Sequence, residues 1–310
     1  ATGMNHIDLE AAAELGIAVK NAVGYSTHAV TETTIGAAIG LLRQTVYYDR
    51  YVKTAYAGSP LQYHFGRTTH QLYGSKWGIV GLGNIGRSVA RVAEALGCRI
   101  AYTSTSGVVR EEPYPEKPLD ELLRWADVVS VHAPLNDRTR NLIGARELAL
   151  MKPSAILINV ARGGIYNVKS LSDFVAAGKI FAAGIDMFEE EPCTGSPLHE
   201  FDNVLLTPHL GASTHEAQVR AGVQIAEYVS SGLEGSIVPT ALNMTLVPPE
   251  MMDAVGPYVP ACQMMGRILA QILGCIPKTL RVEAAGTIAN ADASILVAGA
   301  LDGILAYRRA

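Results

Sequence analysis

Residues 77–86 read Trp-Gly-Ile-Val-Gly-Leu-Gly-Asn-Ile-Gly, a short apolar run that ends in a G-x-G-x-x-G motif. The apolar run is typical of a buried strand, and residues 87–96 have the pattern of a helix. In this context Gly81 permits a tight turn, Gly83 lets the backbone approach a pyrophosphate, and Gly86 lets the helix pack closely on the strand. The free N–H groups at the start of the helix also favour phosphate. The stretch therefore predicts a dinucleotide-binding turn.

Outward from this motif, apolar runs alternate with amphipathic stretches. The predicted strands are 77–80, 99–102, 128–132, 155–159, 182–186 and 204–206. The predicted helices are 87–96, 119–125, about 146–151, 168–177 and about 213–233. Strands that alternate with helices favour a parallel, doubly wound sheet of the Rossmann type. The sequence thus predicts an α/β fold.

The two ends of the chain predict further elements outside this sheet. Near the start they are a helix over 8–15, a strand over 17–21, a helix over about 27–56 and a loop over 57–75. Towards the end they are a helix over 264–273, a strand-like run over 279–285 and a helix from about 293. The change in character near residue 237 indicates a separate, small α/β unit.

The composition limits the class of protein. With 310 residues, 49% of them hydrophobic and 17% charged, the chain can bury the cores of two or three domains. Its net charge of −4 provides no basic surface for nucleic acid, and no apolar run approaches the ~20 residues that span a bilayer. We therefore expect no nucleic-acid or membrane partner. The sequence shows no secretion signal and no metal-binding spacing of its four cysteines, so we expect a cytoplasmic location and no metal site.

The end of the second predicted strand lacks a residue that this fold often carries. An acidic side chain is expected there, roughly 20 residues after the glycine motif, to bind the ribose 2′-hydroxyl of NAD. Residues 102–107 read Tyr-Thr-Ser-Thr-Ser-Gly instead, and the first acid is Glu111. The hydroxyl of Ser104 and its neighbours can bind either a ribose or a 2′-phosphate, and Arg99 and Arg110 lie nearby in sequence. The cofactor is thus predicted as NAD, with NADP possible.

A charged side chain follows each of the last three predicted strands: Arg162, Glu191 and His209. The carboxyl ends of parallel strands line one crevice, so these groups are expected to converge beside the nucleotide. A guanidinium grips a carboxylate in bidentate fashion, and an imidazole can take or return an alcohol proton. Glu191 could pair with His209 and fix its tautomer. Taken singly, each residue also fits an ordinary surface position; together they predict transfer of a hydride and a proton on a 2-hydroxy acid.

Six stretches of the chain resemble the D-isomer-specific 2-hydroxyacid dehydrogenase family over roughly residues 1–236. They are TGMNHIDLEAA, WGIVGLGNIGRSVA, VVSVHAPL, MKPSAILINVARGG, AAGIDMFEEEP and TPHLGAST. The resemblance implies an NAD(P)-dependent dehydrogenase in which Arg162 orients the substrate, His209 is the acid and base, and Glu191 is its partner. Asp186 matches the residue that holds the nicotinamide carboxamide. The predicted cofactor-binding residues are Thr34, Gly81, Gly83, Asn84, Ile85, Gly86, Ser104, His132, Pro134, Val160, Ala161, Asp186 and Gly211.

The resemblance also implies a division of the chain. Residues 1–24 are expected to be the remnant of a substrate domain that continues before this sequence, and 25–212 the dinucleotide-binding domain. Residues 213–236 are expected to form a helix that returns to the substrate domain, and 237–310 part of an intervening, regulatory-type domain. The helix over 27–56 implies a homodimer or a higher homo-oligomer.

The choice of substrate is left open by the sequence. PHLGAST, HEAQVRAG and the tail from Ile237 resemble the phosphoglycerate branch of the family, which serves serine biosynthesis. NAVGYSTHAV and YTSTSG resemble members that act on glyoxylate, hydroxypyruvate or branched 2-oxo acids. A different hypothesis is a chain that binds or senses the cofactor without a complete substrate site.

Overall fold

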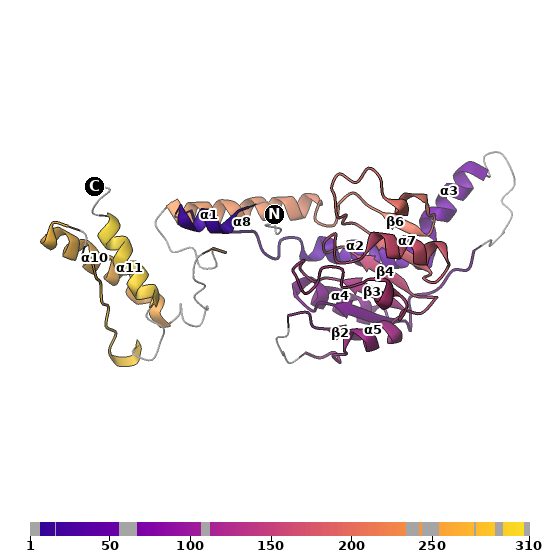
Figure 1. The fold of residues 1–310 in the computed structure, drawn as a ribbon, viewed down its shortest axis with the longest axis horizontal. Helices are drawn as coiled ribbons and strands as arrows, with labels where there is room; N and C mark the ends of the chain where they lie inside the picture. Colours follow the sequence, from indigo (N-terminus) through magenta and orange to yellow (C-terminus); the bar gives the residue numbers. More distant parts are fainter. Residues whose placement is uncertain are drawn as a thin grey trace. The chain divides into compact units, whose positions relative to one another are not determined.

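The computed structural model describes residues 7–15, 17–55, 67–106, 112–233, 242–243, 254–275, 277–288 and 294–306 (Figure 1). The chain divides into two compact units. One is Val23–Val223, and the other joins Ala1–Ala22 to Gln224–Ala310. The finer division into four segments stays a prediction.

A six-stranded parallel sheet forms the centre of the unit 23–223, in the order β2-β1-β3-β4-β5-β6. Its strands are β1 (Lys76–Val80), β2 (Arg99–Thr103), β3 (Val128–Val131), β4 (Ile156–Asn159), β5 (Ala182–Ile185) and β6 (Val204–Leu206). Every neighbouring pair is parallel. The chain adds β2 on one side of β1 and then adds β3 to β6 on the other side. The predicted doubly wound α/β fold is confirmed. β1 to β5 are almost wholly buried, which explains their unbroken apolar runs.

Helices cover both faces of this sheet (Figure 1). The helices of the unit are α2 (Thr27–Leu42), α3 (Thr45–Ala55), α4 (Asn84–Ala95), α5 (Leu119–Trp125), α6 (Ala145–Leu148), α7 (Val168–Ala176), the 3-10 turn η1 (Pro197–Glu200) and the first part of α8 (His215–Leu233). On one face α2 and α4 pack over Ile79 and Ile158. On the other, α5, α6 and α7 pack over Val129 and Leu157. The carboxyl ends of the strands are left for the loops that carry the site.

The single helix predicted over 27–56 is wrong, because the structure has two helices there, α2 and α3. The break lies at Gln44, whose φ of 55° is left-handed. The Gln44 N–H binds the carbonyl of Leu41, which closes the last turn of α2 tightly and turns the chain before α3 begins. The apolar spacing continues through the break, so periodicity alone does not show it.

Two predicted strands are not formed. Residues 17–21 have no regular structure: the Val19 N–H donates to the Asn243 side chain (2.9 Å), and the Val19 carbonyl accepts from the Leu242 N–H (2.8 Å). Residues 279–285 are also irregular and lead into a 3-10 turn, η3 (Gly286–Ile288). A strand requires a partner ladder, and an apolar run alone does not supply one. Residues 67–75 form the predicted loop, and 57–66 lie outside the described residues.

Among the described residues of the second unit, the regular elements are all helices. Its elements are α1 (Leu9–Glu14), the last part of α8, η2 (Gly256–Tyr258), α10 (Val259–Leu273), η3 and α11 (Ser294–Ala306). α10 and α11 pack closely at Gly266. A Cβ at this position would lie 2.0 Å from the Ala300 carbonyl oxygen, so the contact requires glycine. Within the described parts of both units, no helix has the length and apolar character needed to cross a membrane.

Candidate active site

The glycine motif forms the turn between β1 and α4. Gly81 has a φ of 94°, which favours glycine, and its N–H donates to the carbonyl of Thr103 (3.0 Å). A Cβ on Gly86 would lie 2.3 Å from the Gly81 carbonyl oxygen, so only glycine lets α4 pack this closely. Gly83 has open space beside it and begins α4 with no side-chain cap. An open glycine before uncapped helix N–H groups, at Asn84 and Ile85, fits the pyrophosphate of a dinucleotide.

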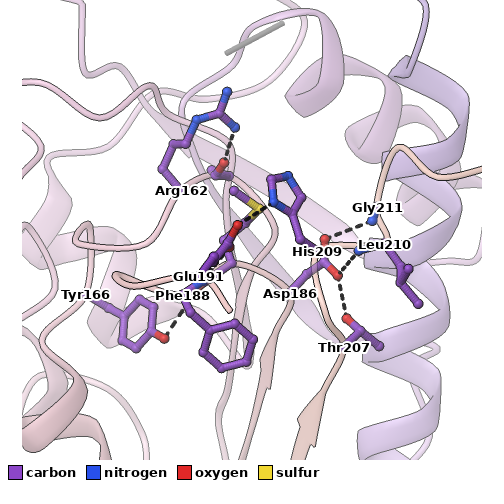
Figure 2. Close-up of polar contacts among 11 residues, drawn as sticks. Arg162, Tyr166, Asp186, Phe188, Glu191, Thr207, His209, Leu210 and Gly211 are labelled. Carbon is purple, nitrogen blue, oxygen red and sulfur yellow. Dashed lines mark hydrogen bonds and ion pairs between the residues drawn. The ribbon is translucent and has the colours of Figure 1, made fainter. Parts of the chain in front are cut away.

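His209 and Glu191 are in direct contact (Figure 2). The His209 Nδ1 lies 2.7 Å from the Glu191 Oε2, and the other carboxylate oxygen accepts the Phe188 N–H (3.1 Å). The Glu191 carboxylate is therefore anchored by its own loop and directs one oxygen to the imidazole. The side chains are 48% and 33% exposed, respectively, so the pair is open to a ligand. A carboxylate at Nδ1 holds the ring proton there and leaves Nε2 for the substrate.

Asp186 holds the loop that carries His209. Its buried carboxylate accepts hydrogen bonds from the Thr207 hydroxyl (2.6 Å), the Leu210 N–H (2.7 Å) and the Gly211 N–H (2.8 Å). Figure 2 shows these bonds converging on one side chain. His209 itself has a left-handed φ of 57°, which costs a non-glycine residue roughly 1–2 kcal/mol. The three bonds to Asp186 offset that cost.

Arg162 lies on a loop that Asn159 fixes. The buried Asn159 side chain donates to the Arg162 carbonyl (2.8 Å) and accepts the Ala161 N–H (3.2 Å). The Arg162 guanidinium donates to the Ala161 carbonyl (2.7 Å), and Figure 2 shows it clear of the Glu191–His209 pair. A Cβ on Gly163 would lie 1.9 Å from the Phe188 carbonyl oxygen, so the loop after β4 packs directly on the loop after β5.

His132 lies at the end of β3, against the glycine turn. The Trp77 indole N–H donates to the Ser130 hydroxyl (2.8 Å), and that hydroxyl lies 3.0 Å from the His132 Nε2. Burial lowers the pKa of His132 to about 3, so the ring is neutral. The other ring nitrogen, Nδ1, is buried without a hydrogen-bond partner among the described residues. The sequence contained no signal for this chain of contacts.

The remaining predicted cofactor residues have different surroundings. Thr34 is buried, and its hydroxyl donates to the carbonyl of Val30 in its own helix (2.7 Å). Its neighbour Thr33 instead lines a cavity of about 200 Å³ together with Val160 and Asp186. Pro134 is exposed, and Ser104 is half-buried. The structure thus gathers Val160, Ala161, Asp186 and Gly211 around the catalytic candidates, whereas Thr34 faces its own helix.

Comparison with known proteins agrees with this geometry. Residues 35–211 match the family model of the D-isomer specific 2-hydroxyacid dehydrogenase, NAD binding domain. The chain is 35% identical to a D-3-phosphoglycerate dehydrogenase of Methanocaldococcus jannaschii over 315 residues, which are 98% of this chain and 58% of that protein. It is 37% identical to a glyoxylate reductase of Aeropyrum pernix over 256 residues, which are 80% of this chain and 76% of that protein.

A crystal structure of a Thermus thermophilus protein is also similar, with a TM-score of 0.73 and 34% identity over 78% of this chain and 76% of that one. The chain spans little more than half the length of the phosphoglycerate dehydrogenases that it matches. The chain belongs to the D-isomer specific 2-hydroxyacid dehydrogenase family.

Proposed function

We propose that this chain transfers a hydride between a 2-hydroxy acid and NAD, with Arg162, Glu191 and His209 as its catalytic residues. The observation that carries the proposal is the contact between Glu191 and His209, open to a ligand, at the edge of the sheet that also holds the glycine turn. When bound, the nicotinamide would accept the hydride from the hydroxyl-bearing carbon, or return it in the reverse direction.

His209 supplies the proton step. In oxidation its Nε2 takes the proton of the substrate hydroxyl, and in reduction it returns a proton to the carbonyl oxygen. Glu191 holds the imidazole through its Nδ1, 2.7 Å from the carboxylate, and leaves Nε2 directed to the substrate. The Phe188 N–H keeps that carboxylate in place, so the imidazole plane is oriented before the substrate binds.

Arg162 is proposed to bind the substrate carboxylate. A guanidinium has five N–H donors in a planar fork that matches a carboxylate, and the bond to the Ala161 carbonyl uses one of them. Asn159 fixes the backbone from which this side chain extends. The charge of Arg162 also polarises the adjacent carbonyl during reduction.

The cofactor would lie along the carboxyl ends of the strands. Gly81, Gly83 and Gly86, with the N–H groups that follow, are proposed to hold the pyrophosphate. The nicotinamide end is proposed to contact Val160, Ala161, Asp186 and Gly211, with Ser104, His132 and Pro134 as further contacts. Thr33, which lines the cavity beside Val160 and Asp186, takes the place predicted for Thr34. The Asp186 carboxylate accepts three hydrogen bonds from the loop that carries His209. If Asp186 also contacts the nicotinamide, this one residue joins the cofactor to that loop.

We propose 3-phosphoglycerate as the substrate, in serine biosynthesis, because relatives with that name match 97–98% of this chain, including its tail. Glyoxylate or hydroxypyruvate is the second candidate, supported by the similarity to a glyoxylate reductase. A cytoplasmic homodimer is proposed as the working form. Exposed apolar side chains on α2 and α3, at Ile39, Val46 and Val52, support the dimer.

One assay tests this proposal. The purified chain would be mixed with NAD and 3-phosphoglycerate, and separately with NADH and glyoxylate or hydroxypyruvate, while the absorbance of the reduced nicotinamide is followed. We expect turnover that His209→Asn abolishes and that the matched change at an exposed histidine, His199→Asn, leaves intact. Binding of NADH without turnover on any of these acids would refute the enzymatic role and favour a chain that only binds the cofactor.

A further inference from the structure

The carboxyl end of β2 has a carboxylate that β2 itself does not carry. Residues 115–117 run beside Tyr102: the Tyr102 N–H donates to the Pro115 carbonyl (3.1 Å), and the Lys117 N–H donates to the Tyr102 carbonyl (2.8 Å). This places Glu116 at the end of the strand. Its carboxylate accepts the Ser104 N–H (3.3 Å) on one oxygen and the Tyr102 hydroxyl (3.4 Å) on the other.

That carboxylate lies close to the glycine turn. β1 and β2 are in register at Val80 and Thr103, and the Gly81 N–H binds the Thr103 carbonyl (3.0 Å). Ser104, which donates to Glu116, is the next residue. The acid is therefore positioned where the first two strands of this fold end, which is where a dinucleotide places its adenosine ribose.

We propose that Glu116 binds the 2′-hydroxyl of the adenosine ribose and makes the chain select NAD over NADP. The proposal rests on the cofactor site of the proposed function. Glu116 is exposed, and each of its oxygens has one protein donor in the contacts described, so a second donor can be accommodated. A carboxylate accepts a hydrogen bond from a hydroxyl, whereas it repels a phosphate at the same position.

The neighbouring charges favour the same choice. Arg87, directly after the glycine motif, has a partner: its Nε lies 2.9 and 3.1 Å from the two oxygens of Glu112, and its Nη2 also donates to that carboxylate. The pair is half-buried, so this cation is already neutralised. Arg99 is at the opposite end of β2, four residues or about 13 Å from the ribose end. Arg110 lies outside the described residues.

Glu116→Gln tests the role with little change in shape, because the amide oxygen can still accept the Ser104 N–H. Nicotinamide fluorescence would give the dissociation constants of NADH and NADPH for the whole chain. We expect the unaltered chain to prefer NADH, and Glu116→Gln to reduce the NADPH-to-NADH ratio of dissociation constants about tenfold, mainly through tighter NADPH binding. The matched control is Glu121→Gln, an exposed acid on α5, which should leave the ratio unchanged.

Three outcomes would overturn the inference. In the first, Glu116→Gln changes the ratio of dissociation constants no more than Glu121→Gln does. In the second, Glu116→Gln weakens the binding of NADH and of NADPH equally, as loss of a purely structural residue would. The unaltered chain could also prefer NADPH. Failure of the proposed function looks different, because then neither cofactor binds or no acid turns over. Glu116→Ala, with its melting temperature measured, separates lost ribose binding from a disturbed end of β2.

Discussion

Asp186 offers the sharpest test of how the structure presents His209. Replacing Asp186 by Asn keeps the shape of the side chain but leaves one acceptor oxygen in place of two. Three donors converge on the carboxylate, from Thr207, Leu210 and Gly211. With the amide oxygen towards Thr207 and Leu210, the amide NH2 faces the Gly211 N–H, and one buried donor loses its partner.

The cost follows from these contacts. A buried donor left without a partner costs about 1–3 kcal/mol, and each of the two remaining bonds loses about 1 kcal/mol when its acceptor is no longer charged. The sum is about 3–5 kcal/mol, a large part of the stability of an ordinary domain. The left-handed His209 loses its anchors at the same time, so the loop should open locally before the sheet unfolds.

Hydrogen exchange measured by mass spectrometry, on a peptide that covers Thr207–Gly211 in the cofactor-free chain, checks this value. Asp186→Asn should speed exchange of the Leu210 and Gly211 amides at least a hundredfold, since each 1.4 kcal/mol is about tenfold. Thr207→Val, which removes only the hydroxyl bond, should speed it about fivefold. Exchange in Asp186→Asn within a factor of three of the unaltered chain would refute the reasoning.

Glu191→Gln should lower turnover by roughly a hundredfold to ten-thousandfold while the affinity for NADH stays the same. The Phe188 N–H requires the amide oxygen, so the NH2 faces the His209 Nδ1 and moves the ring proton to Nε2; undiminished turnover would contradict this. His132→Gln should flatten the acid side of the stability curve. The native pKa of about 3 lies below the ordinary 6.5, so this group's contribution is complete above pH 6.5 and falls towards pH 3. Urea denaturation would give the free energy of unfolding at pH 7 and at pH 5. Between these pH values the unaltered chain should lose about 2 kcal/mol more than His132→Gln, and equal losses in the two proteins would refute the prediction.

The sheet could be predicted from the sequence because β1 to β5 are almost wholly buried and β6 is a short apolar run beside them. The run 204–206 and the helix 119–125 have the same bounds in the prediction and in the structure. Such runs are short, apolar and separated by helices, so each one identifies itself locally. The turn at Gly81 and the contact between Glu191 and His209 could be predicted once the strands were placed. The carboxyl ends of parallel strands meet at one edge of the sheet, so residues that follow those strands lie near one another.

The rest depends on contacts that the local pattern does not contain. Gln44 divides a helix whose apolar spacing continues unbroken. The apolar run 17–21 forms hydrogen bonds with Leu242 and Asn243 instead of pairing with a strand. The acid that β2 lacks is provided by Glu116, which lies beside Tyr102 and accepts the Ser104 N–H. Each of these depends on a partner far along the chain or on one backbone angle.

Transfer of deuterium from substrate to cofactor shows whether this site moves a hydride. The chain would be incubated with NAD and with 3-phosphoglycerate deuterated at the hydroxyl-bearing carbon. The mass of the reduced cofactor would then be measured by mass spectrometry. We expect one deuterium in the nicotinamide ring of the reduced cofactor, and no labelled cofactor with His209→Asn. The same incubation with deuterated glycolate covers the second candidate substrate. Absence of labelled cofactor from both acids, in a preparation that binds NADH, would contradict the claim that this crevice transfers a hydride.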